Sequence, residues 1–232
     1  MNIVYSCEMP EIQVIALRTL GGIMSGDEGQ TQTVIEQDVL HNYKNLLQMQ
    51  PIKIIKEACY TLSNIAAGNH AQIEVIISAG LIDILLELMS SPNLSIQIES
   101  YWVINNAIYN GSVEQVQWIL SKNVIKILKP FLDNKKNNIL KACLDCYLKI
   151  LKTGQTISKS KGFEKNFYIE EILQHSIDES IEKCVKNPEK KIYKLAIKIL
   201  EGYIDEYDSE CVDTDECDSG EVDNDIIDFE EF

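Results

Sequence analysis

The chain has 232 residues, of which 45% are hydrophobic and 25% charged, a composition typical of globular proteins of one or two domains. It contains 36 acidic and 21 basic residues, which gives a formal net charge of −15. Residues 205–232 hold 14 of the acidic residues and none of the basic ones, so the rest of the chain is close to neutral. Nucleic acid is therefore not an expected partner, because no basic face is available to displace counterions from phosphates.

The first ten residues, MNIVYSCEMP, lack a basic stretch followed by an apolar one, so no secretory signal is expected. The longest apolar run, Val75 to Met89, is interrupted by charged residues and is too short to span a bilayer, so no membrane partner is expected. Seven cysteines without a framework spacing indicate reduced thiols and a cytoplasmic or nuclear location. Cys143 and Cys146 form a single C-x-x-C without a nearby His, which favours a helical core pair over a metal site.

A repeat of 42 residues organises the chain. Four segments of similar sequence begin 42 residues apart, at Ala16, Ala58, Ser100 and Ala142. One column of this alignment holds Arg18, Tyr60, Trp102 and Leu144, and the column four residues later holds Gly22, Asn64, Asn106 and Leu148. A glycine closes each segment, at Gly26, Gly68, Gly111 and Gly154. Equal steps of this kind indicate a solenoid of stacked repeats.

The stretches between these segments predict two further helices in each repeat. A short apolar-periodic helix is followed by a break at Gly80 or Asn123, residue types that end helices in a left-handed turn, and then by a second helix. One short and two longer helices in about 42 residues form the armadillo pattern, and no segment shows strand alternation. The predicted fold is thus all-α, a right-handed armadillo-repeat α-solenoid.

The organisation along the chain is predicted in three parts. Residues 1–154 form the repeats, 155–207 a linker and C-terminal capping helices, and 208–232 a disordered acidic tail. Within the middle part we expect an exposed loop at 155–166, a helix over Phe167–Asn187 and a helix over Glu189–Tyr207. The last helix carries an apolar stripe of Ile192, Leu195, Ala196, Ile199, Leu200, Tyr203 and Ile204, which suits it to cap the stack.

The repeated columns predict a site for an extended basic peptide. Residues three and four apart share a helix face, so Glu57, Tyr60 and Asn64 project together, as do their counterparts Glu99, Trp102 and Asn106. An Asn amide binds peptide N–H and C=O groups, an aromatic face accepts Lys or Arg, and a carboxylate adds charge. Tyr60 and Trp102 as core aromatics are the alternative, and Arg18 as either a groove charge or a salt-bridge partner is left open.

The motif W-x-x-x-N, present as Trp102–Asn106 and in variant form as Tyr60–Asn64, resembles the importin alpha family. ALRTLGG-x-x-SG-x-E-x-QTQ resembles that family's sixth repeat, KEACYTLSNIAAGNHAQI the seventh, IESYWVINNA the eighth, KACLDCYLKILKTG the ninth and IYKLAIKILEGYIDEY the tenth. The resemblance implies a nuclear import adaptor that binds nuclear localisation signals at the minor site. The residues it assigns are Glu57, Tyr60, Ser63, Asn64, Glu99, Trp102 and Asn106, with Gly26, Glu28 and Thr31.

The resemblance also sets expectations for partners. It implies shuttling between cytoplasm and nucleus, and a recycling exportin that binds the C-terminal region. Importin beta is not expected, because the Arg-rich segment that binds it in the family, like the first five repeats, is absent from this chain, which is a fragment or a reduced relative. The alternative function is a truncated armadillo interaction scaffold that has lost transport.

Two departures from the family pattern affect the site. Tyr60 stands in place of the tryptophan and Gly22 in place of the asparagine. The three histidines lie in separate repeats without nucleophile partners, and there is no phosphate-binding loop. No catalytic residue, metal or cofactor is therefore expected, and the chain is not predicted to be an enzyme.

Overall fold

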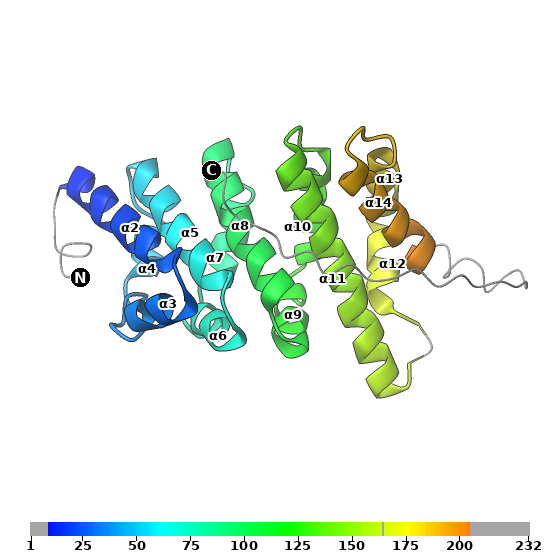
Figure 1. Cartoon of the computed structure of the whole chain (residues 1–232), viewed down its shortest axis with the longest axis horizontal. Helices are drawn as coiled ribbons and strands as arrows, with labels where there is room; N and C mark the ends of the chain where they lie inside the picture. The colour runs from blue at the N-terminus through cyan, green and yellow to red at the C-terminus, as the bar shows by residue number, and fades with distance from the viewer. Residues whose placement is uncertain (1–8, 164, 205–232) are drawn as a thin grey trace, which may run out of the picture.

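The computed structural model describes residues 9–163 and 165–204, and the regular elements in these residues are all helices. The longest helices of successive repeats lie side by side in chain order (Figure 1). They are α2 (Pro10–Met24), α5 (Ile52–Ala66), α8 (Leu94–Asn110), α11 (Asn137–Lys161) and α14 (Lys190–Ile199), the last continued by the π-helix η2 (Leu200–Ile204). Helices α2, α5, α8 and α11 correspond to the third helices of the predicted repeats, and α14 corresponds to the last predicted capping helix.

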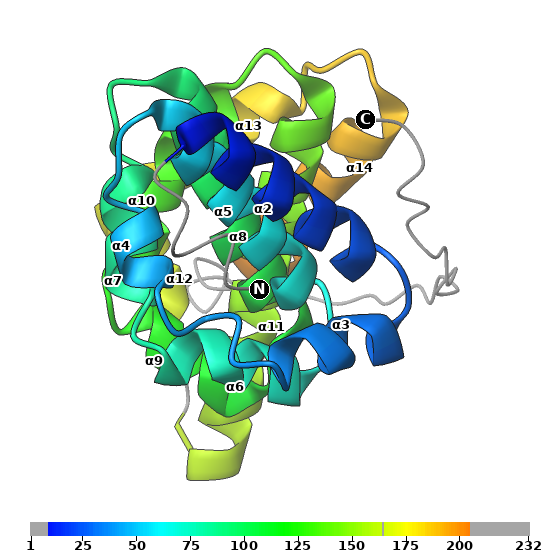
Figure 2. The same ribbon diagram turned by 90° about the vertical axis from the view of Figure 1, so that its left-hand side faces the viewer.

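Two short helices connect each pair of third helices, and Figure 2 shows them along two edges of the stack. The first helices are α3 (Glu28–Ile35), α6 (His70–Ser78), α9 (Val113–Leu120) and α12 (Phe167–Gln174). The second helices are α4 (Tyr43–Leu46), α7 (Ile82–Leu88), α10 (Val124–Leu128) and α13 (Ile177–Cys184). A 3₁₀ helix, η1 (Lys129–Asp133), continues α10. The predicted three-helix repeat and the all-α solenoid are confirmed.

Left-handed residues separate the first and second helices, as predicted. Gly80 has φ 63° and Asn123 φ 60°. Ser176, with φ 49°, makes the same break between α12 and α13. The single helix expected over 167–187 is therefore wrong: this segment is a pair of short helices like the pairs before it. A serine at the break carried no turn signal in the sequence.

The loop expected at 155–166 is also wrong over most of its length. Helix α11 passes through Gly154 and ends only at Lys161, where Gly162 adopts φ 69° as a left-handed cap. Gly154 instead permits close packing inside the bundle. A Cβ on it would lie 2.0 Å from Oδ1 of Asn166, whose Nδ2 donates to the main-chain oxygen of Leu151 at 2.8 Å.

A continuous core of Leu, Ile and Val side chains runs along the stack. Tyr101 is fully buried in it and stacks on Phe131 with ring centroids 4.3 Å apart. Cys143 and Cys146 are both fully buried free thiols, which confirms the core-pair interpretation of the C-x-x-C. Burial raises the pKa of both thiols well above the usual range.

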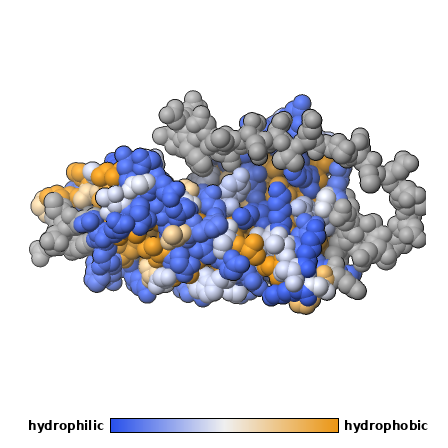
Figure 3. Space-filling view, turned by 60° about the horizontal axis from the view of Figure 1, so that its bottom comes forward, coloured by the Kyte–Doolittle hydropathy of each residue, from blue (hydrophilic) through white to orange (hydrophobic). Residues whose placement is uncertain are grey.

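The two ends of the described stack differ. Ile192, Ala196 and Ile199 of the last helix are buried, and Leu195, Leu200 and Tyr203 pack partly buried against the core, which confirms the predicted apolar stripe up to Tyr203. The side chain of Ile204, its last predicted member, lies outside the described residues. On α2, by contrast, Ile15 and Ile23 are 64% and 44% exposed, and hydrophobic surface is visible at that end of the molecule (Figure 3). The predicted acidic tail, 208–232, lies outside the described residues. Within the described ranges, no helix is long and apolar enough to cross a membrane.

Candidate peptide-binding ladder

The predicted site residues on α5 and α8 form two equivalent rungs. We call Glu57, Tyr60, Asn64, Glu99, Trp102 and Asn106 the ladder. The buried positions of α8 repeat those of α5 at a distance of 42 residues, which places the two Glu–aromatic–Asn sets on corresponding faces of adjacent third helices. None of the six side chains belongs to the fully buried core, and Tyr60 is 37% exposed.

Each ladder asparagine is held by the repeat before it. Nδ2 of Asn64 donates to the main-chain oxygen of Gly21 at 2.9 Å, and Nδ2 of Asn106 donates to that of Ser63 at 3.1 Å. Within the described chain Oδ1 of these amides accepts no hydrogen bond from protein. One N–H thus fixes the orientation of each amide, and its oxygen is left to meet a ligand N–H.

The two aromatic side chains are supported differently. Trp102 is half-buried and packs edge-on against the core ring of Tyr101, with centroids 5.4 Å apart and an interplanar angle of 61°. Tyr60 lies over Gly21 of α2, where a Cβ would come within 2.7 Å of its ring. Both rings are thus anchored along one side and neither is fully buried, a position suited to receiving a cation.

Glu57 is paired within the protein. Arg18 of α2 donates through Nε and Nη2 to Oε1 of Glu57, with the Nε–Oε1 distance 3.0 Å. The Arg18 side chain is 70% exposed, whereas that of Glu57 is 14% exposed. The structure thus decides between the two roles that the sequence left open: Arg18 is a salt-bridge partner, and it offsets the charge of the first rung.

Glu99 supplies the second rung with a carboxylate of a different character. Its half-buried position raises the pKa of its carboxyl. Nearby Lys56 and Lys136 act against this rise, whereas Glu57 adds to it. Partial burial has removed water from this carboxylate, so a ligand cation would stabilise its charge more than it would stabilise that of an exposed carboxylate.

The remaining predicted residues lie around the ladder. Ser63 is buried, and its hydroxyl donates to the main-chain oxygen of Tyr60 at 2.8 Å. Thr31 is 3% exposed and its hydroxyl donates to the main-chain oxygen of Met24 at 3.0 Å. Glu28 accepts a hydrogen bond from Nδ2 of Asn69. These three side chains therefore make internal bonds, and Glu28 and Thr31 lie on α3, away from the two rungs.

Gly26 serves a cap that sequence reasoning missed. Asp27 and Gln30 form a capping box at the start of α3, and a Cβ on Gly26 would lie 1.6 Å from Oε1 of Gln30. The equivalent glutamines bind the preceding repeat: Nε2 of Gln72 donates to Glu28 O at 3.1 Å, and Nε2 of Gln115 to His70 O at 2.8 Å. The sequence held a signal for these contacts, because a glutamine stands four residues after each of Gly26, Gly68 and Gly111.

The third 42-residue step is wrong by one residue. The buried residues Cys143, Leu144 and Tyr147 of α11 correspond to those of α8 at a distance of 43. Leu144 and Leu148, which the sequence alignment placed beside the ladder, are therefore core residues, 0% and 8% exposed. The sequence already carried a signal of this shift, because Gly68 and Gly111, which come after α5 and α8, lie 43 residues apart instead of 42. Helix α8 is also longer than α5, with 17 residues against 15.

This shift places different chemistry on α11. Asp145 stands where α8 has Trp102, and Lys149 where it has Asn106. Asp145 is paired with Lys141, whose Nζ lies 3.0 Å from Oδ2. Burial and the neighbouring Lys152 hold the pKa of Lys149 below its usual value. The Glu–aromatic–Asn set thus does not continue beyond α8.

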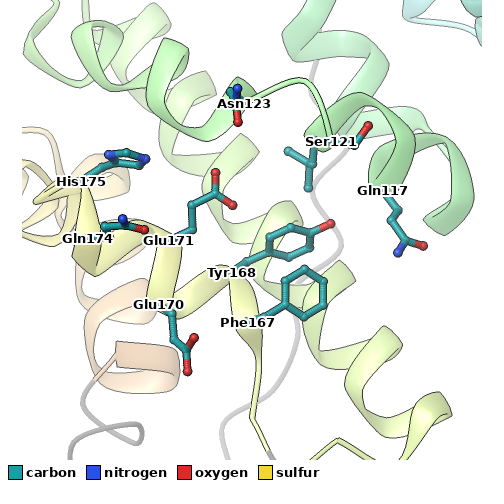
Figure 4. A pocket seen from close by; sticks show the side chains of 10 residues that line it. Gln117, Ser121, Asn123, Phe167, Tyr168, Glu170, Glu171, Gln174 and His175 are labelled. Carbon is teal, nitrogen blue, oxygen red and sulfur yellow. The ribbon is translucent and has the colours of Figure 1, made fainter.

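A cavity of about 520 Å³ lies between α9, the turn that precedes α10, and α12, apart from the ladder (Figure 4). Its walls include Gln117, Asn123, Tyr168 and Glu171. Partial burial raises the pKa of Glu171, and His175 acts against this rise. No predicted site residue lines the cavity, and among the described residues no three His, Cys, Asp or Glu side chains gather as a metal site would require.

Comparisons with known proteins agree with this architecture. The family model for the Armadillo/beta-catenin-like repeat matches residues 69–107, which include the rung on α8. A designed armadillo repeat protein in complex with the peptide (KR)4 has a TM-score of 0.71 and 25% identity, over 84% of this chain and 77% of that one.

Similarity to natural proteins extends over most of the chain. This chain is 37% identical to importin subunit alpha-1a of Oryza sativa subsp. japonica over 201 residues. The aligned residues are 86% of this chain and 38% of the relative. The chain is also 37% identical over 206 residues to importin subunit alpha-4 of Arabidopsis thaliana, again 38% of the relative. The chain thus spans less than half the length of these relatives, and the resemblance to importin alpha is confirmed.

Proposed function

Because this chain is an armadillo-repeat protein related to the importin alpha subunits, we propose that it binds basic peptides, such as nuclear localisation signals, in extended form along the ladder. One observation carries the proposal: the same Glu–aromatic–Asn set occurs on two adjacent third helices, with both amides held in the same orientation by the repeat before. For the whole protein we propose the role of an adaptor in nuclear import, present in cytoplasm and nucleus, which the similarity to importin alpha subunits supports.

The spacing of the rungs suits an extended chain. Packed helices lie about 8–10 Å apart, and an extended peptide rises about 3.3 Å per residue, so every third residue or so would meet a new rung. The amides of Asn64 and Asn106 would bind the peptide backbone, whatever its sequence. Trp102 and Tyr60 would receive the stems and cationic heads of Lys or Arg, and Glu99 would neutralise one of them.

A solved relative supports the class of ligand. The designed armadillo protein with 25% identity is bound to (KR)4, a peptide of alternating lysine and arginine. We further propose Gly26, Ser63, Glu28 and Thr31 as a flank of the site, an assignment that rests on the resemblance to the importin alpha family. For the recycling exportin, residues 208–232 stay the proposed contact, to be tested by loss of exportin binding when the chain is shortened at Asp208.

The experiment that tests the ladder uses the two tryptophans of the chain as a matched pair. Binding of a Lys/Arg-rich peptide is measured by calorimetry for the wild type, Trp102→Ala and Trp118→Ala. Trp118 is 40% exposed on α9 and already holds Lys122 over its ring, 5.0 Å from the centroid. We expect Trp102→Ala to weaken binding by about 0.5–2 kcal/mol and Trp118→Ala to leave it unchanged.

Tyr60→Ala should cost less than Trp102→Ala, because indole is the better cation partner and has the larger face. Equal binding by the wild type and a Trp102→Ala/Asn106→Ala double variant would place the peptide elsewhere. A folded wild type that binds no basic peptide would favour the alternative of an interaction scaffold.

A further inference from the structure

We propose that the ligand of the ladder is a basic segment followed, on the α11 side, by acidic residues, and that Lys149 and Lys152 select for this pattern. The inference rests on the proposed function and names the class of peptide that the site takes. It begins from the one-residue shift between α8 and α11, which puts Lys149 at the position of the ladder asparagines.

The charges of the third helices change sign along the stack. The α8 rung offers Glu99 and an aromatic ring to a cation. On α11 the corresponding position to the ring is Asp145, but Lys141 neutralises it at 3.0 Å. On the same helix, C-terminal to this ion pair, lie the half-buried Lys149 and the exposed Lys152.

Lys149 and Lys152 have no ion-pair partner among the described residues. Partial burial of Lys149, and after it the charge of Lys152, lowers the pKa of Lys149, so an anion beside the two lysines would relieve an unfavourable arrangement. Lys149 contrasts with the cation at the other end of the ladder, since Arg18 is bound to Glu57. At the two ends of the ladder, the Arg18 cation is therefore paired, whereas among the described residues Lys149 and Lys152 are not.

The next third helix continues the basic character. Ile192, Ala196 and Ile199 of α14 match the buried positions of α11 at a distance of 53 residues. In this register the exposed Lys194 and Lys198 of α14 occupy the positions that Lys141 and Asp145 have on α11. A peptide that runs past Trp102 would thus leave a face built for cations and meet one built for anions.

Peptide geometry sets where the change of charge must fall. With helices about 8–10 Å apart and about 3.3 Å per extended residue, the side chain near Lys149 is about three residues from the one on Trp102. A uniformly basic peptide would be repelled there, whereas Asp or Glu would be attracted. The site therefore prefers a basic cluster with an acidic neighbour over a longer basic run.

The test compares three peptides that share one basic core and carry a flank of three Glu, three Ser or three Lys residues, each flank placed at either end of the core in turn. Binding is measured by calorimetry at about 0.15 M salt with the full chain. The variants are Lys149→Gln/Lys152→Gln and, as a control of equal charge on the same helix, Lys159→Gln/Lys161→Gln.

We expect the Glu flank at one end to tighten binding about three- to tenfold over the Ser flank, and the Lys flank to weaken it. The preference should vanish in Lys149→Gln/Lys152→Gln and persist in the control variant. Equal affinity for the three flanks, or a preference that survives Lys149→Gln/Lys152→Gln, would overturn the inference and leave the proposed function intact. No binding of any core peptide would overturn both. A preference seen only after removal of residues 205–232 would assign the lysines to this chain's own acidic segment and also overturn it.

Discussion

Asn106 donates its Nδ2 hydrogen to the main-chain oxygen of Ser63, 3.1 Å away, so a residue of the proposed peptide site also joins α8 to α5. Asn64 joins α5 to α2 in the same way, through Gly21. Each amide is held before any ligand arrives, and this lowers the entropy that binding would cost. In the proposed site, stability and peptide binding would therefore depend on the same side chain.

Asn106→Ala should consequently have two measurable effects. Loss of a partly buried hydrogen bond should lower the free energy of unfolding by about 0.5–1.5 kcal/mol, and basic peptides of different sequence should bind more weakly by similar factors, because the amide contacts the backbone. Asn110→Ala is the control: Nδ2 of Asn110 joins α8 to Ala66 O at 3.4 Å, one turn beyond the ladder. It should lower stability but not affinity. Sequence-dependent losses in Asn106→Ala would contradict backbone binding.

Arg18→Gln should strengthen the binding of basic peptides, because it releases Glu57 from its ion pair. Arg18 is 70% exposed, so solvent screening limits the gain to a few-fold at most, and the gain should shrink as salt is raised. Calorimetry at two salt concentrations measures it. Lys122→Gln breaks a comparable pair with Asp83, away from the ladder, and should change nothing. Weaker binding by Arg18→Gln would show that Arg18 contacts the peptide itself.

Much of this structure was predictable from periodicity. The three-helix repeat, the left-handed breaks at Gly80 and Asn123, and the two Glu–aromatic–Asn rungs follow from spacing and residue type. The break at Ser176 was not predictable, because serine, unlike glycine and asparagine, has no marked local preference for the left-handed region. The end of a helix predicted at Gly154 was wrong for a related reason. A glycine can mark a helix end, but it can also permit close packing inside a helix, as Gly154 does against Asn166.

The sequence could place the side chains of the ladder on two adjacent helices but could not predict their pairings, and peptide binding there stays a prediction. No local pattern shows that Arg18 reaches Glu57, since the two lie 39 residues apart and meet only when α2 packs on α5. The change of register at α11 left a signal only in the glycines, because Gly68 and Gly111 lie 43 residues apart. Leu144 and Leu148 preserve helical spacing with the columns before them, and burial shows that Asp145 and Lys149 occupy the ladder positions instead.

Glu99→Gln should stabilise the fold and weaken peptide binding. The raised pKa of Glu99 means that the folded state binds a proton more tightly than the unfolded chain, so its contribution to stability falls as pH rises above the usual value of 4.5. At a pH above the raised pKa of Glu99, the Glu99→Gln protein should have a higher melting temperature than the wild type. Well below pH 4.5 the difference in melting temperature should disappear. Thermal unfolding at several pH values measures this.

The same carboxyl should make peptide binding depend on pH. Protonation removes the charge that Glu99 offers, so the affinity of the wild type for a basic peptide should fall as the pH is lowered through the raised pKa of Glu99. Lys56, Glu57 and Lys136 share this environment: the two lysines lower the pKa of Glu99 and Glu57 raises it. Glu99→Gln should bind more weakly at neutral pH and lack this part of the pH dependence. An unchanged pH profile in Glu99→Gln would assign the dependence to another group.

Adjacent glycines of α2 should respond in opposite ways to alanine. A Cβ on Gly22 would meet nothing within 4 Å, so Gly22→Ala should stabilise the helix by about 0.5–1 kcal/mol and leave peptide affinity unchanged. A Cβ on Gly21 would lie 2.7 Å from the ring of Tyr60, which must then move from its place on the first rung. Gly21→Ala should therefore lose this gain in stability and also bind basic peptides more weakly. Chemical denaturation and calorimetry on both variants test the pair, and a Gly21→Ala protein as stable and as tightly binding as Gly22→Ala would show that Tyr60 does not depend on this contact.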